Sequence, residues 1–568
     1  MYRRILPHLA SMGAIVALAC ALYVPFLGNP MVFDDRSLFS GARFAYYATT
    51  PFGLDLRLLP YFTLAFPQVM WGHFPPWAHA EIHRILSLVF HIATALALYK
   101  LVHDLLLGAA RPDAKSPEAA RVNAIALAFF GAAVFAIHPV AVYGAGYLVQ
   151  RTTILATLFS LLSIIYFVRG LGRARHVDAL AAAFFYTLAV FSKEHSVLLP
   201  AAAVMVTPLL TQDRHFAIRY AGIYLLACLP AAITVVTLIR WVIGQAYEPG
   251  VDLLLAQIEG IPALDTTGGP WLVSAVTQAG LFFKYLAFWL APDTGTMSVD
   301  IRIDFAQTWS PGWIVLKVAA FLAVGLSALV LLRRGGRAGL VGFGLLYTWI
   351  LFAVELSSVR FQEPFVLYRS YLWAPGILMA VVAVLSGLSR RAALALFAAV
   401  SPLLLYQAHD RLQSFSSNLA LWEDAAAKLP STPVPWGSRT LFNLGRAQVY
   451  ANQADQAIDS ANRCMTLYPR TFYCYFARGA VHIQIGEYEQ ALPYLERALT
   501  IYPDSGIAYH HRGLALEKLG RLDEARQAYR KASRLRFAGA HYRLDLLEST
   551  GGGSQVLYDT SRSLRKPE

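Results

Sequence analysis

Long apolar runs and short basic patches alternate over roughly the first three quarters of the chain. A helix of about 20 apolar residues crosses the ~30 Å hydrocarbon core of a bilayer, so these runs predict membrane-spanning helices. The eleven predicted spans are residues 8–28, 82–107, 122–142, 150–168, 178–192, 195–211, 217–243, 312–332, 338–356, 371–389 and 392–408. The pattern therefore predicts an all-α, polytopic transmembrane domain over residues 1–409.

The positive charges agree with one orientation of these spans. If the N-terminus is cytoplasmic, every inside loop is basic, as the positive-inside rule requires. The basic residues of these loops are Arg3, Arg4, Arg111, Lys115, Arg121, Arg169, Arg173, Arg175, Arg214, Arg219, Arg333, Arg334, Arg337, Arg390 and Arg391. Because the number of spans is odd, the C-terminus is then expected outside the cytoplasm.

Two segments leave alternatives to this topology. The first apolar run follows the basic start MYRR, and it is interpreted as a retained helix, with a cleaved signal peptide as the alternative. The segment 244–311 is predicted to be external, and its stretch TQAGLFFKYLAFWLAP predicts a helix that lies in the interface or re-enters the membrane. A genuine span in that segment would invert the position of the C-terminus.

Composition supports the membrane class and argues against nucleic acid as a partner. Hydrophobic residues make up 57% of the chain and charged residues only 15%, which exceeds the apolar content of an ordinary soluble domain. The formal net charge is +13. The Lys and Arg residues lie in short patches between apolar runs rather than in one stripe, a pattern typical of an orientation signal.

The last part of the chain has an internal repeat. Gly445, Gly479 and Gly513 recur every 34 residues, and Ala457, Ala491, Ala525, Pro469 and Pro503 keep the same register. This period is typical of tetratricopeptide repeats (TPRs), in which small residues let two antiparallel helices approach closely. The sequence predicts a linker with a partial leading helix at 410–437, three repeats over 438–539 that form an α-solenoid, and a tail at 540–568.

Two cysteines fall within neighbouring predicted helices of the repeats. Cys464 lies in the second helix of repeat one and Cys474 in the first helix of repeat two. An oxidising compartment permits a disulfide between them, whereas a small-residue packing position is also compatible with a buried free thiol. Cys20 and Cys228 lie in predicted spans and are expected to be packing residues.

Four stretches of the membrane domain resemble motifs of one glycosyltransferase group. They are FDDRSLF (33–39), IHPVAVYGAGYLVQRTTILATLFSLLSIIYF (137–167), FSKEHSVLLP (191–200) and LYRSYLWAPGI (367–377). Together with the C-terminal repeats, the chain resembles the transmembrane-and-TPR O-mannosyltransferases and their bacterial relatives, which belong to the GT-C class. The resemblance implies a GT-C-like catalytic domain in a bacterial inner membrane, with the TPR domain on the external, periplasmic side.

A sugar transfer from a polyprenyl phosphate to a hydroxyl needs a base that takes the hydroxyl proton. Asp34 and Asp35 follow the first span on the predicted external side, where they are candidate catalytic residues. One of them is expected to act as the base and the other to position the acceptor or bind a metal. Sequence gives a weak preference for Asp35. The alternative is a solvated acidic loop.

The departing phosphate needs cations, because negative charge develops on it as the bond to the sugar breaks. Arg151, Lys193 and Arg369 lie near predicted external ends of spans, where basic residues depart from the inside-positive trend. They are the predicted donor-phosphate ligands. As alternatives, Arg151 or Arg369 snorkels to the headgroups, and Lys193 forms a structural ion pair with Glu194.

Four further residues are possible supporting groups. His83 and His138 could contact phosphate or order a loop, Glu194 could belong to the site, and Tyr371 could contact a substrate or sit in the interfacial aromatic belt. No common metal or nucleotide motif is present in the sequence. A divalent cation is possible through oxygen ligands near Asp34, Asp252 and Asp300, but no cofactor is assigned.

The predicted function is therefore a membrane glycosyltransferase. Its donor is expected to be a polyprenyl-phosphate-linked sugar, and its acceptor is expected to be a hydroxyl of an exported protein that the TPR domain recruits. The membrane domain is expected to contact membrane lipids. A lipid or glycan acceptor and an oligosaccharide donor stay open. The alternative from a different class is a non-catalytic membrane scaffold whose repeats bind envelope or export partners.

Overall fold

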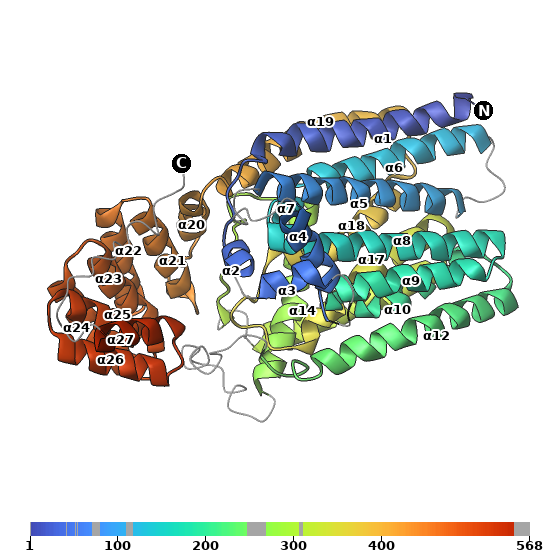
Figure 1. Ribbon diagram of the computed structural model, residues 1–568. Helices are drawn as coiled ribbons and strands as arrows, with labels where there is room; N and C mark the ends of the chain where they lie inside the picture. Colours follow the sequence, from blue (N-terminus) through green and yellow to red (C-terminus); the bar gives the residue numbers. More distant parts are fainter. Residues whose placement is uncertain are drawn as a thin grey trace. The chain divides into compact units, whose positions relative to one another are not determined.

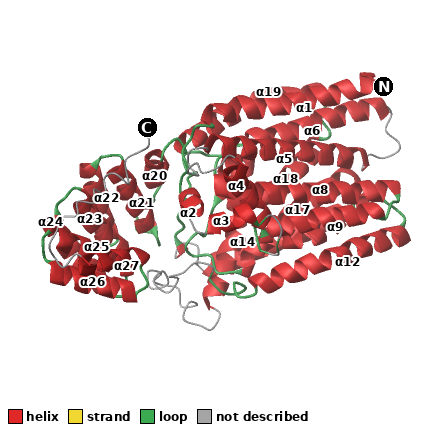
Figure 2. Ribbon diagram, in the orientation of Figure 1, coloured by secondary structure: helices red, strands yellow, loops and turns green. Residues whose placement is uncertain are grey.

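The computed structural model describes residues 2–40, 43–50, 53, 55–70, 80–108, 117–246, 269–305 and 311–549. Within these ranges the chain is helical, with only two isolated β-bridges (Figure 2). It divides into two compact units, Met1–Lys428 and Leu429–Glu568. The first unit is the membrane domain and the second contains the repeats.

The first unit is a bundle of long helices in which α5, α6, α8, α9 and α12 run side by side (Figure 1). Its helices and 3₁₀ turns are α1 (Tyr2–Tyr23), η1 (Val24–Phe26), α2 (Asp34–Ser40), α3 (Arg43–Thr49), α4 (Leu58–Met70), α5 (Ala80–Gly108), α6 (Pro117–Ile137), α7 (Pro139–Ala145), η3 (Leu148–Gln150), α8 (Arg151–Arg173), α9 (Val177–Ser192), η4 (Glu194–Leu198), α10 (Leu199–Val204), α11 (Thr207–Leu210), α12 (Arg214–Ile239), α14 (Gly269–Leu290), α16 (Pro311–Arg333), α17 (Gly336–Phe352), η6 (Ala353–Ser357), η7 (Leu367–Leu372), α18 (Ala374–Leu385), α19 (Arg390–Ser414) and α20 (Asn418–Ala427).

Nine helices of the described residues are long and apolar enough to cross a membrane. They are Ile5–Phe26, Ala80–Gly108, Ala120–Ile137, Leu148–Arg173, Arg214–Ile239, Gly269–Leu290, Gly312–Arg333, Gly336–Ser357 and Arg390–Ser414. Eight of the nine coincide with predicted spans, and the ninth is α14. The all-α, multi-pass architecture predicted from sequence is therefore confirmed.

Three predicted spans differ from the helices observed. The predicted span 195–211 is divided into η4, α10 and α11, because Pro200 and Pro208 each lack the amide that a continuous helix needs and begin new turns instead. The prediction of one span there is wrong. The predicted spans 178–192 and 371–389 correspond to the shorter apolar helices α9 and α18. Pro375 lies in the first turn of α18, so that helix begins only at Ala374.

Helix α14 contains the stretch predicted to lie in the interface. Trp271 Nε1 donates to Leu356 O at 2.9 Å, Gln278 Nε2 to Pro364 O at 2.7 Å, and Trp289 Nε1 to Ser370 Oγ at 2.9 Å. These bonds tie α14 along its length to the segment 356–370. Its length and composition are those of a membrane span, and its placement in the interface stays a prediction.

Close packing of α17 against α18 depends on two glycines. A Cβ on Gly344 would lie 2.5 Å from the carbonyl oxygen of Gly376, and one on Gly376 would lie 2.4 Å from Thr348 Oγ1. Such contacts are too short for any side chain, so the two helices approach at their backbones, as helices in membranes do at small residues. This contact supports η7, which directly precedes α18 and carries Arg369.

The second unit is a solenoid of helix pairs, as the 34-residue period predicts. Its helices are α21 (Gly437–Tyr450), α22 (Ala454–Leu467), α23 (Phe472–Gln484), α24 (Tyr488–Ile501), α25 (Gly506–Lys518), α26 (Leu522–Arg534) and α27 (Ala538–Ser549). Ala457, Ala491 and Ala525 are all fully buried, which confirms their packing role. The predicted tail at 540–568 is wrong over its first ten residues, because α27 continues to Ser549.

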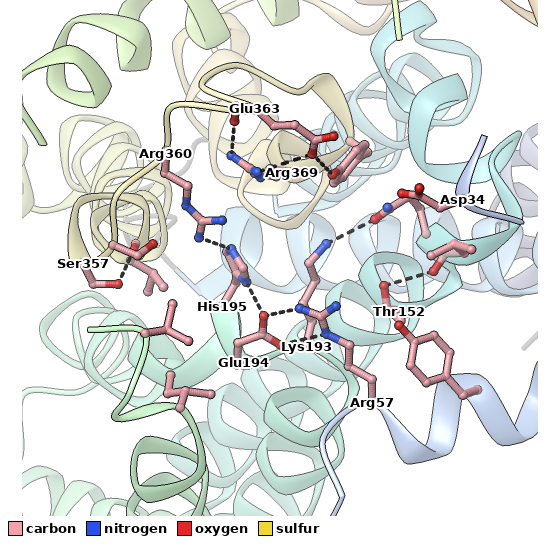
Figure 3. Close-up of a pocket in the computed structure, with 18 of the residues that line it drawn as sticks. Asp34, Arg57, Thr152, Lys193, Glu194, His195, Ser357, Arg360, Glu363 and Arg369 are labelled. Atoms are coloured by element: carbon pink, nitrogen blue, oxygen red, sulfur yellow. Dashed lines mark hydrogen bonds and ion pairs between the residues drawn. The ribbon is translucent and has the colours of Figure 1, made fainter. Parts of the chain in front are cut away.

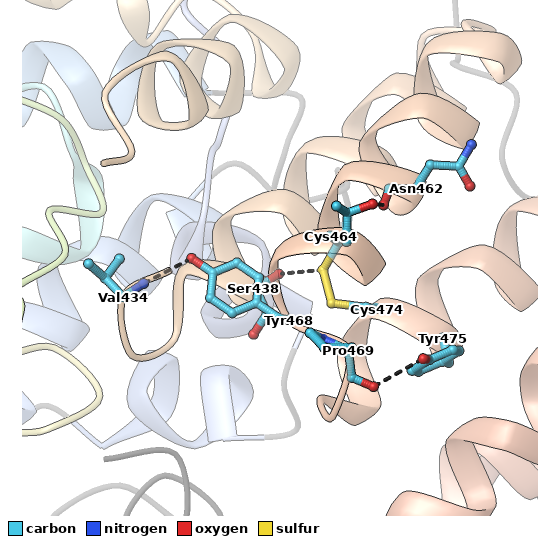
Figure 4. Close-up of a disulfide and its surroundings, with 9 residues drawn as sticks. Val434, Ser438, Asn462, Cys464, Tyr468, Pro469, Cys474 and Tyr475 are labelled. Carbon is cyan, nitrogen blue, oxygen red and sulfur yellow. Dashed lines mark hydrogen bonds between the residues drawn. A yellow bond between two sulfur atoms is a disulfide. The ribbon is translucent and has the colours of Figure 1, made fainter. Parts of the chain in front are cut away.

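A disulfide joins the first repeat to the second (Figure 4). Cys464 near the end of α22 and Cys474 at the start of α23 are bonded, with their Cα atoms 5.2 Å apart. The Tyr468 hydroxyl in the intervening turn accepts a hydrogen bond from Val434 N at 3.3 Å. The bridge predicted as one of two possibilities for this cysteine pair is therefore present. Cys20 and Cys228 are free.

Candidate functional site

A cavity of about 550 Å³ lies at one end of the helical bundle, where α2, η3, η4, η6 and η7 meet. This volume is typical of a site for a small-molecule ligand, ~300–1,000 Å³. The cavity is lined by Asp34, Leu38, Tyr47, Arg57, Tyr61, Val149, Gln150, Thr152, Lys193, Glu194, His195, Ile239, Val242, Ile243, Val354, Ser357, Ser358, Arg360, Glu363, Tyr368 and Arg369. Four basic side chains, those of Arg57, Lys193, Arg360 and Arg369, surround the same space (Figure 3).

Lys193 is held by neutral partners. It follows the last residue of α9, where the chain turns into an extended conformation, and it is buried. Its Nζ donates to Thr153 Oγ1 at 2.5 Å and to Gln150 Oε1 at 3.2 Å, and it lies 5.1 Å from the centre of the Tyr368 ring. Among the residues that the structure describes, Lys193 forms no ion pair. Burial, reinforced by the positive charge of Arg57, lowers the pKa of Lys193 to about 7.

Glu194 pairs with Arg57 rather than with Lys193. Arg57 precedes α4 and donates two hydrogen bonds to the Glu194 carboxylate, and its backbone amide donates to Phe191 O at 2.8 Å. Burial alone would raise the pKa of Glu194, but Arg57 and His195 hold it well below its ordinary value. The predicted alternative of a Lys193–Glu194 ion pair is therefore not what these side chains form.

Arg369 and Arg360 share the buried carboxylate of Glu355. Arg369 Nη1 lies 3.3 Å and Arg360 Nε 3.5 Å from Glu355 Oε2, while His195 Nε2 lies 3.1 Å from Oε1. Arg369 also donates to the carbonyl of Glu363 at 3.0 Å. One anion thus fixes three basic side chains of the cavity wall.

The two adjacent aspartates have different surroundings. Asp34 is exposed and lines the cavity, and its backbone amide donates to the Tyr147 hydroxyl at 3.1 Å. Asp35 is fully buried and does not line the cavity. Its Oδ1 accepts from Val149 N at 2.9 Å and its Oδ2 from Val32 N at 3.3 Å. Burial raises the pKa of Asp35 to about 7, although Arg84 acts in the opposite direction. The geometry favours Asp34, not Asp35, as the side chain that meets a substrate.

Arg84 holds the loops that carry these aspartates. Its guanidinium donates to three backbone carbonyls, those of Asn29 at 2.8 Å, Pro30 at 2.6 Å and Gly146 at 2.6 Å. The two loops, 29–35 after α1 and 146–149 before α8, are thereby joined. Because each buried carbonyl needs a donor, this arrangement fixes the start of α2 firmly.

Arg151 does not line the cavity. It is fully buried at the start of α8 and donates to Ser87 Oγ at 3.1 Å, Thr63 O at 2.7 Å and His83 O at 2.5 Å. These bonds join α8 to α4 and α5. The predicted role in phosphate binding therefore finds no support in its position, and neither does the alternative of a snorkelling side chain. Arg151 instead connects three helices.

The other supporting candidates are also packing residues. His138 caps α7 by accepting from Val140 N at 3.2 Å, and its ring stacks on Trp289 at a centroid distance of 4.3 Å. Tyr371 is buried, with its hydroxyl 2.7 Å from His91 Nδ1. His83 is buried beside Phe39, with the ring centres 5.0 Å apart. These three predicted site residues lie outside the cavity lining, whereas Glu194 belongs to it.

Metal binding has no geometric support in the described part of the chain. No group of three or more His, Cys, Asp or Glu side chains is arranged there to hold an ion. Of the three acidic positions considered, Asp300 forms an ion pair with Arg302, and Asp252 lies outside the described residues.

Sequence reasoning missed several residues of the cavity. The charged residues Arg57 and Arg360 line the cavity, and Glu355 lies behind its wall, where it pairs with Arg360. His195, which directly follows the Ser-Lys-Glu stretch, also lines the cavity and contacts Glu355. The only available signal was a charged residue within a predicted external segment, which Arg57 and Arg360 share with many surface residues. Their partners lie far away in sequence, so the pairing could not be seen there.

Comparisons with known proteins identify the repeats and find solved structures that resemble parts of the chain. The tetratricopeptide repeat family profile matches residues 442–506 and 476–536. Among solved structures, MamA is 23% identical with a TM-score of 0.21, and the match covers 24% of this chain and 77% of MamA. MamA from Desulfovibrio magneticus RS-1 gives 23% identity and a TM-score of 0.21, covering 28% of this chain and 84% of that one.

The second likeness extends over most of the chain. The Archaeoglobus fulgidus oligosaccharyltransferase AglB, solved with an inhibitory peptide and a dolichol-phosphate, is 13% identical with a TM-score of 0.37. That match covers 81% of this chain and 60% of AglB, so the chain spans less than two thirds of the length of AglB. A comparison with curated protein sequences found no match. Similarities at this level carry no conclusion about activity.

Proposed function

We propose that this chain is a membrane glycosyltransferase that moves a sugar from a polyprenyl phosphate to a hydroxyl of an exported protein. The observation that carries the proposal is one cavity that contains both Asp34 and Lys193. The Asp34 carboxylate can take the proton of the acceptor hydroxyl. The Lys193 cation, which has no carboxylate partner in the described residues, can bind the departing phosphate.

Asp34 takes the part of the general base in this scheme. The acceptor hydroxyl loses its proton to the Asp34 carboxylate while its oxygen forms a bond to C1 of the sugar. The bond between C1 and the phosphate oxygen breaks, and the electron pair leaves with the lipid phosphate. Asp34 suits this task because it is exposed to the cavity, so it can meet a substrate hydroxyl.

Lys193 takes the part of the phosphate ligand, together with Arg369. The Lys193 ammonium is held by the neutral oxygens of Thr153 and Gln150, so a bound phosphodiester would be its negatively charged partner. A hydrogen bond between two charged groups is stronger in a buried site than in water. Arg369 is fixed beside it by Glu355. Its guanidinium can donate two parallel bonds to phosphate oxygens, which Lys193 cannot.

The apolar part of the cavity suits an isoprenoid chain. Ile239, Val242 and Ile243 line it at the end of α12, and Val354 lines it from η6. Exposed apolar side chains continue from there along α12, including Ile233, Val236 and Leu238. In a membrane these residues face lipid, so a polyprenyl chain could enter from the bilayer without crossing a polar barrier.

The repeats are proposed to recruit the acceptor. Within the second unit, a groove of about 280 Å³ is lined by residues of α21, α23 and α25, among them Phe442, Phe476 and Leu514 with Arg446. The first helices of stacked TPR pairs form the concave surface on which such arrays bind other chains. The disulfide in this unit agrees with an oxidising, external compartment.

The test compares cells that contain the gene, cells that lack it and cells that carry Asp34→Asn. Mass spectrometry of exported proteins and of polyprenyl-linked sugars is the measurement. The proposal expects a protein-linked sugar to disappear, and its lipid-linked donor to accumulate, both without the gene and with Asp34→Asn. If Asp34→Asn restores the wild-type pattern, the chain acts as a scaffold through its repeats and the enzymatic proposal is wrong.

A further inference from the structure

Three side chains of the cavity wall are buried and incompletely hydrogen-bonded. His195, Ser358 and Arg360 line the cavity, and only 5%, 2% and 8% of their surfaces are exposed. Ser358 Oγ has no hydrogen-bond partner among the described residues, and His195 Nδ1 and Arg360 Nε have only long ionic contacts there, at 3.4 Å to Glu194 and 3.5 Å to Glu355. A buried polar atom without a good hydrogen bond is costly in proteins, so one unpartnered hydroxyl beside two weakly bonded basic groups on the same wall points to a ligand that completes them.

The three side chains belong together. Arg360 Nη2 lies 3.3 Å from His195 Nε2. Ser358 is two residues before Arg360 in an extended stretch, where alternate side chains point to the same side. The intervening Val359 donates its amide to Gln245 O at 2.9 Å, which fixes this stretch against the residues after α12. The wall is therefore a rigid, preformed surface.

The charges of this wall are balanced. Arg360 and Arg369 are both paired with Glu355, and Arg369 lies 3.9 Å from the Glu363 carboxylate as well. Two arginines thus face two glutamates, so this wall has no excess of positive charge, and only Arg369, at the side of Lys193, is placed to donate to a phosphate. Lys193 differs, because its partners are neutral oxygens. An anion is expected at Lys193 and an uncharged, hydroxyl-rich group at the wall.

We infer that His195, Ser358 and Arg360 form the subsite for an uncharged sugar of the donor and bind it through its hydroxyl groups. The inference rests on the proposed function, because it takes the phosphate of the same molecule to lie at Lys193. A sugar hydroxyl both donates and accepts a hydrogen bond, as the Ser358 hydroxyl and the imidazole of His195 can. A site that hydrogen-bonds a substrate hydroxyl discriminates strongly against an analogue that lacks it.

The test measures the affinity of purified full-length protein for decaprenyl phosphate alone and for decaprenyl phosphate that carries mannose, glucose, N-acetylglucosamine or glucuronic acid. The wild type is expected to bind at least one neutral sugar lipid more tightly than the bare lipid phosphate and more tightly than the glucuronic acid lipid. Equal affinity for all five lipids, or tightest binding of the acidic one, would overturn the inference.

Ser358→Ala is expected to lower the affinity for the preferred sugar lipid about 3- to 10-fold, the loss of one neutral hydrogen bond, and to leave the affinity for bare decaprenyl phosphate unchanged. Ser357→Ala is the matched control. That neighbouring serine also lines the cavity, but its hydroxyl already donates to Val354 O at 2.7 Å. If both variants change the affinity for the sugar lipid equally, Ser358 has no special role.

Arg360→Lys supplies a second arm that keeps the positive charge beside Glu355 and removes Nε. It is expected to weaken sugar-lipid binding at least as much as Ser358→Ala, again without an effect on the bare lipid phosphate. If either variant lowers the affinity for the sugar lipid and for the bare lipid phosphate equally, the side chain stabilises the cavity and does not bind the sugar. If wild-type protein binds neither bare nor sugar-loaded lipid phosphate, the proposed function itself fails, an outcome distinct from a failure of the subsite.

Discussion

Val149 donates its backbone amide to Asp35 Oδ1 at 2.9 Å, which joins the start of α2 to the turn before α8. The neighbouring Asp34 is left on the cavity wall. Two residues that are alike in the sequence therefore have different tasks. Asp35 fixes the backbone, and Asp34 faces the space that also contains Lys193.

This division predicts a pH effect on stability. The pKa of Asp35 is raised from an ordinary 3.8 to about 7 by burial, so the folded chain binds more protons at this group than the unfolded chain between these values. The free energy of unfolding must then fall as pH rises from about 4 to about 7. Asp35→Asn cannot ionise and keeps an oxygen that can accept from Val149 N, so this contribution disappears.

The measurement is thermal unfolding of wild type and Asp35→Asn in detergent at several pH values. The melting temperature of wild type is expected to fall relative to that of Asp35→Asn as pH rises through this window. Asp34→Asn is the matched control, because Asp34 is exposed, and its melting curve is expected to follow wild type. A constant difference between wild type and Asp35→Asn at all pH values would contradict the account.

Lys193 predicts a pH dependence of donor binding. Its pKa of about 7 is set by burial and by the nearby charges of Arg57, Glu194, Arg369 and Glu355. A bound sugar lipid, whose phosphodiester is anionic, stabilises the charged form and raises this pKa. The affinity for the sugar-loaded decaprenyl phosphate, whose phosphodiester does not titrate in this range, is thus expected to be constant below pH 7 and to fall above it, by up to about tenfold per pH unit.

Lys193→Met is expected to bind the same lipid more weakly at pH 6 and to lose this pH dependence. Lys284→Met is a suitable control, since Lys284 is also basic but does not line the cavity. Titration of both variants and of wild type with the sugar-loaded decaprenyl phosphate between pH 6 and pH 9 gives the comparison. An unchanged slope in Lys193→Met would assign the pH effect to another group.

The disulfide predicts a dependence of the repeats on oxidation. Cross-linking two cysteines ten residues apart stabilises a fold by about 2–3 kcal/mol in the chain-entropy description. Cys464→Ser with Cys474→Ser is therefore expected to make the second unit more susceptible to limited proteolysis, with Cys20→Ser as the control. Non-reducing peptide mapping should find the Cys464–Cys474 peptide in freshly prepared protein. Both thiols free in that protein would contradict the bridge.

The orientation of the chain is tested by reporter fusions. The basic inside loops predict that the second unit lies outside the cytoplasm, so alkaline phosphatase fused after Ser549 is expected to be active and green fluorescent protein at the same place dark. The opposite pair of results would mean that one more or one fewer helix crosses the membrane, and α14 is the first candidate. A reporter inserted at 291–296, after α14, would then locate the difference.

Much of the fold was readable from periodic features of the sequence. The apolar runs predicted most of the long helices, and the 34-residue repeat predicted the solenoid. Both patterns are visible because each depends only on the spacing of nearby residues. The span at 195–211 was mispredicted because apolar composition hid the effect of Pro200 and Pro208 on the helix. The α27 helix was missed because its sequence has little amphipathic pattern.

The site was readable only in part, for a different reason. Lys193 and Arg369 were found because a basic residue at an external helix end departs from the usual charge pattern. Arg151 shares that property, yet its side chain points to Ser87 and Thr63 and away from the cavity. The direction of a side chain depends on contacts between distant elements, and a single sequence contains no record of them. The same holds for Arg57, whose partner Glu194 is 137 residues away.

The central claim is that Asp34 is the base, and the most direct measurement is single-turnover transfer by Asp34→Asn. Purified variant and wild type are given the same sugar lipid and acceptor, and binding of the lipid is measured in parallel. Asn keeps the shape of Asp but takes no proton, so transfer is expected to slow by ~10²–10⁴-fold with lipid affinity unchanged. Transfer by Asp34→Asn at the wild-type rate would contradict the account.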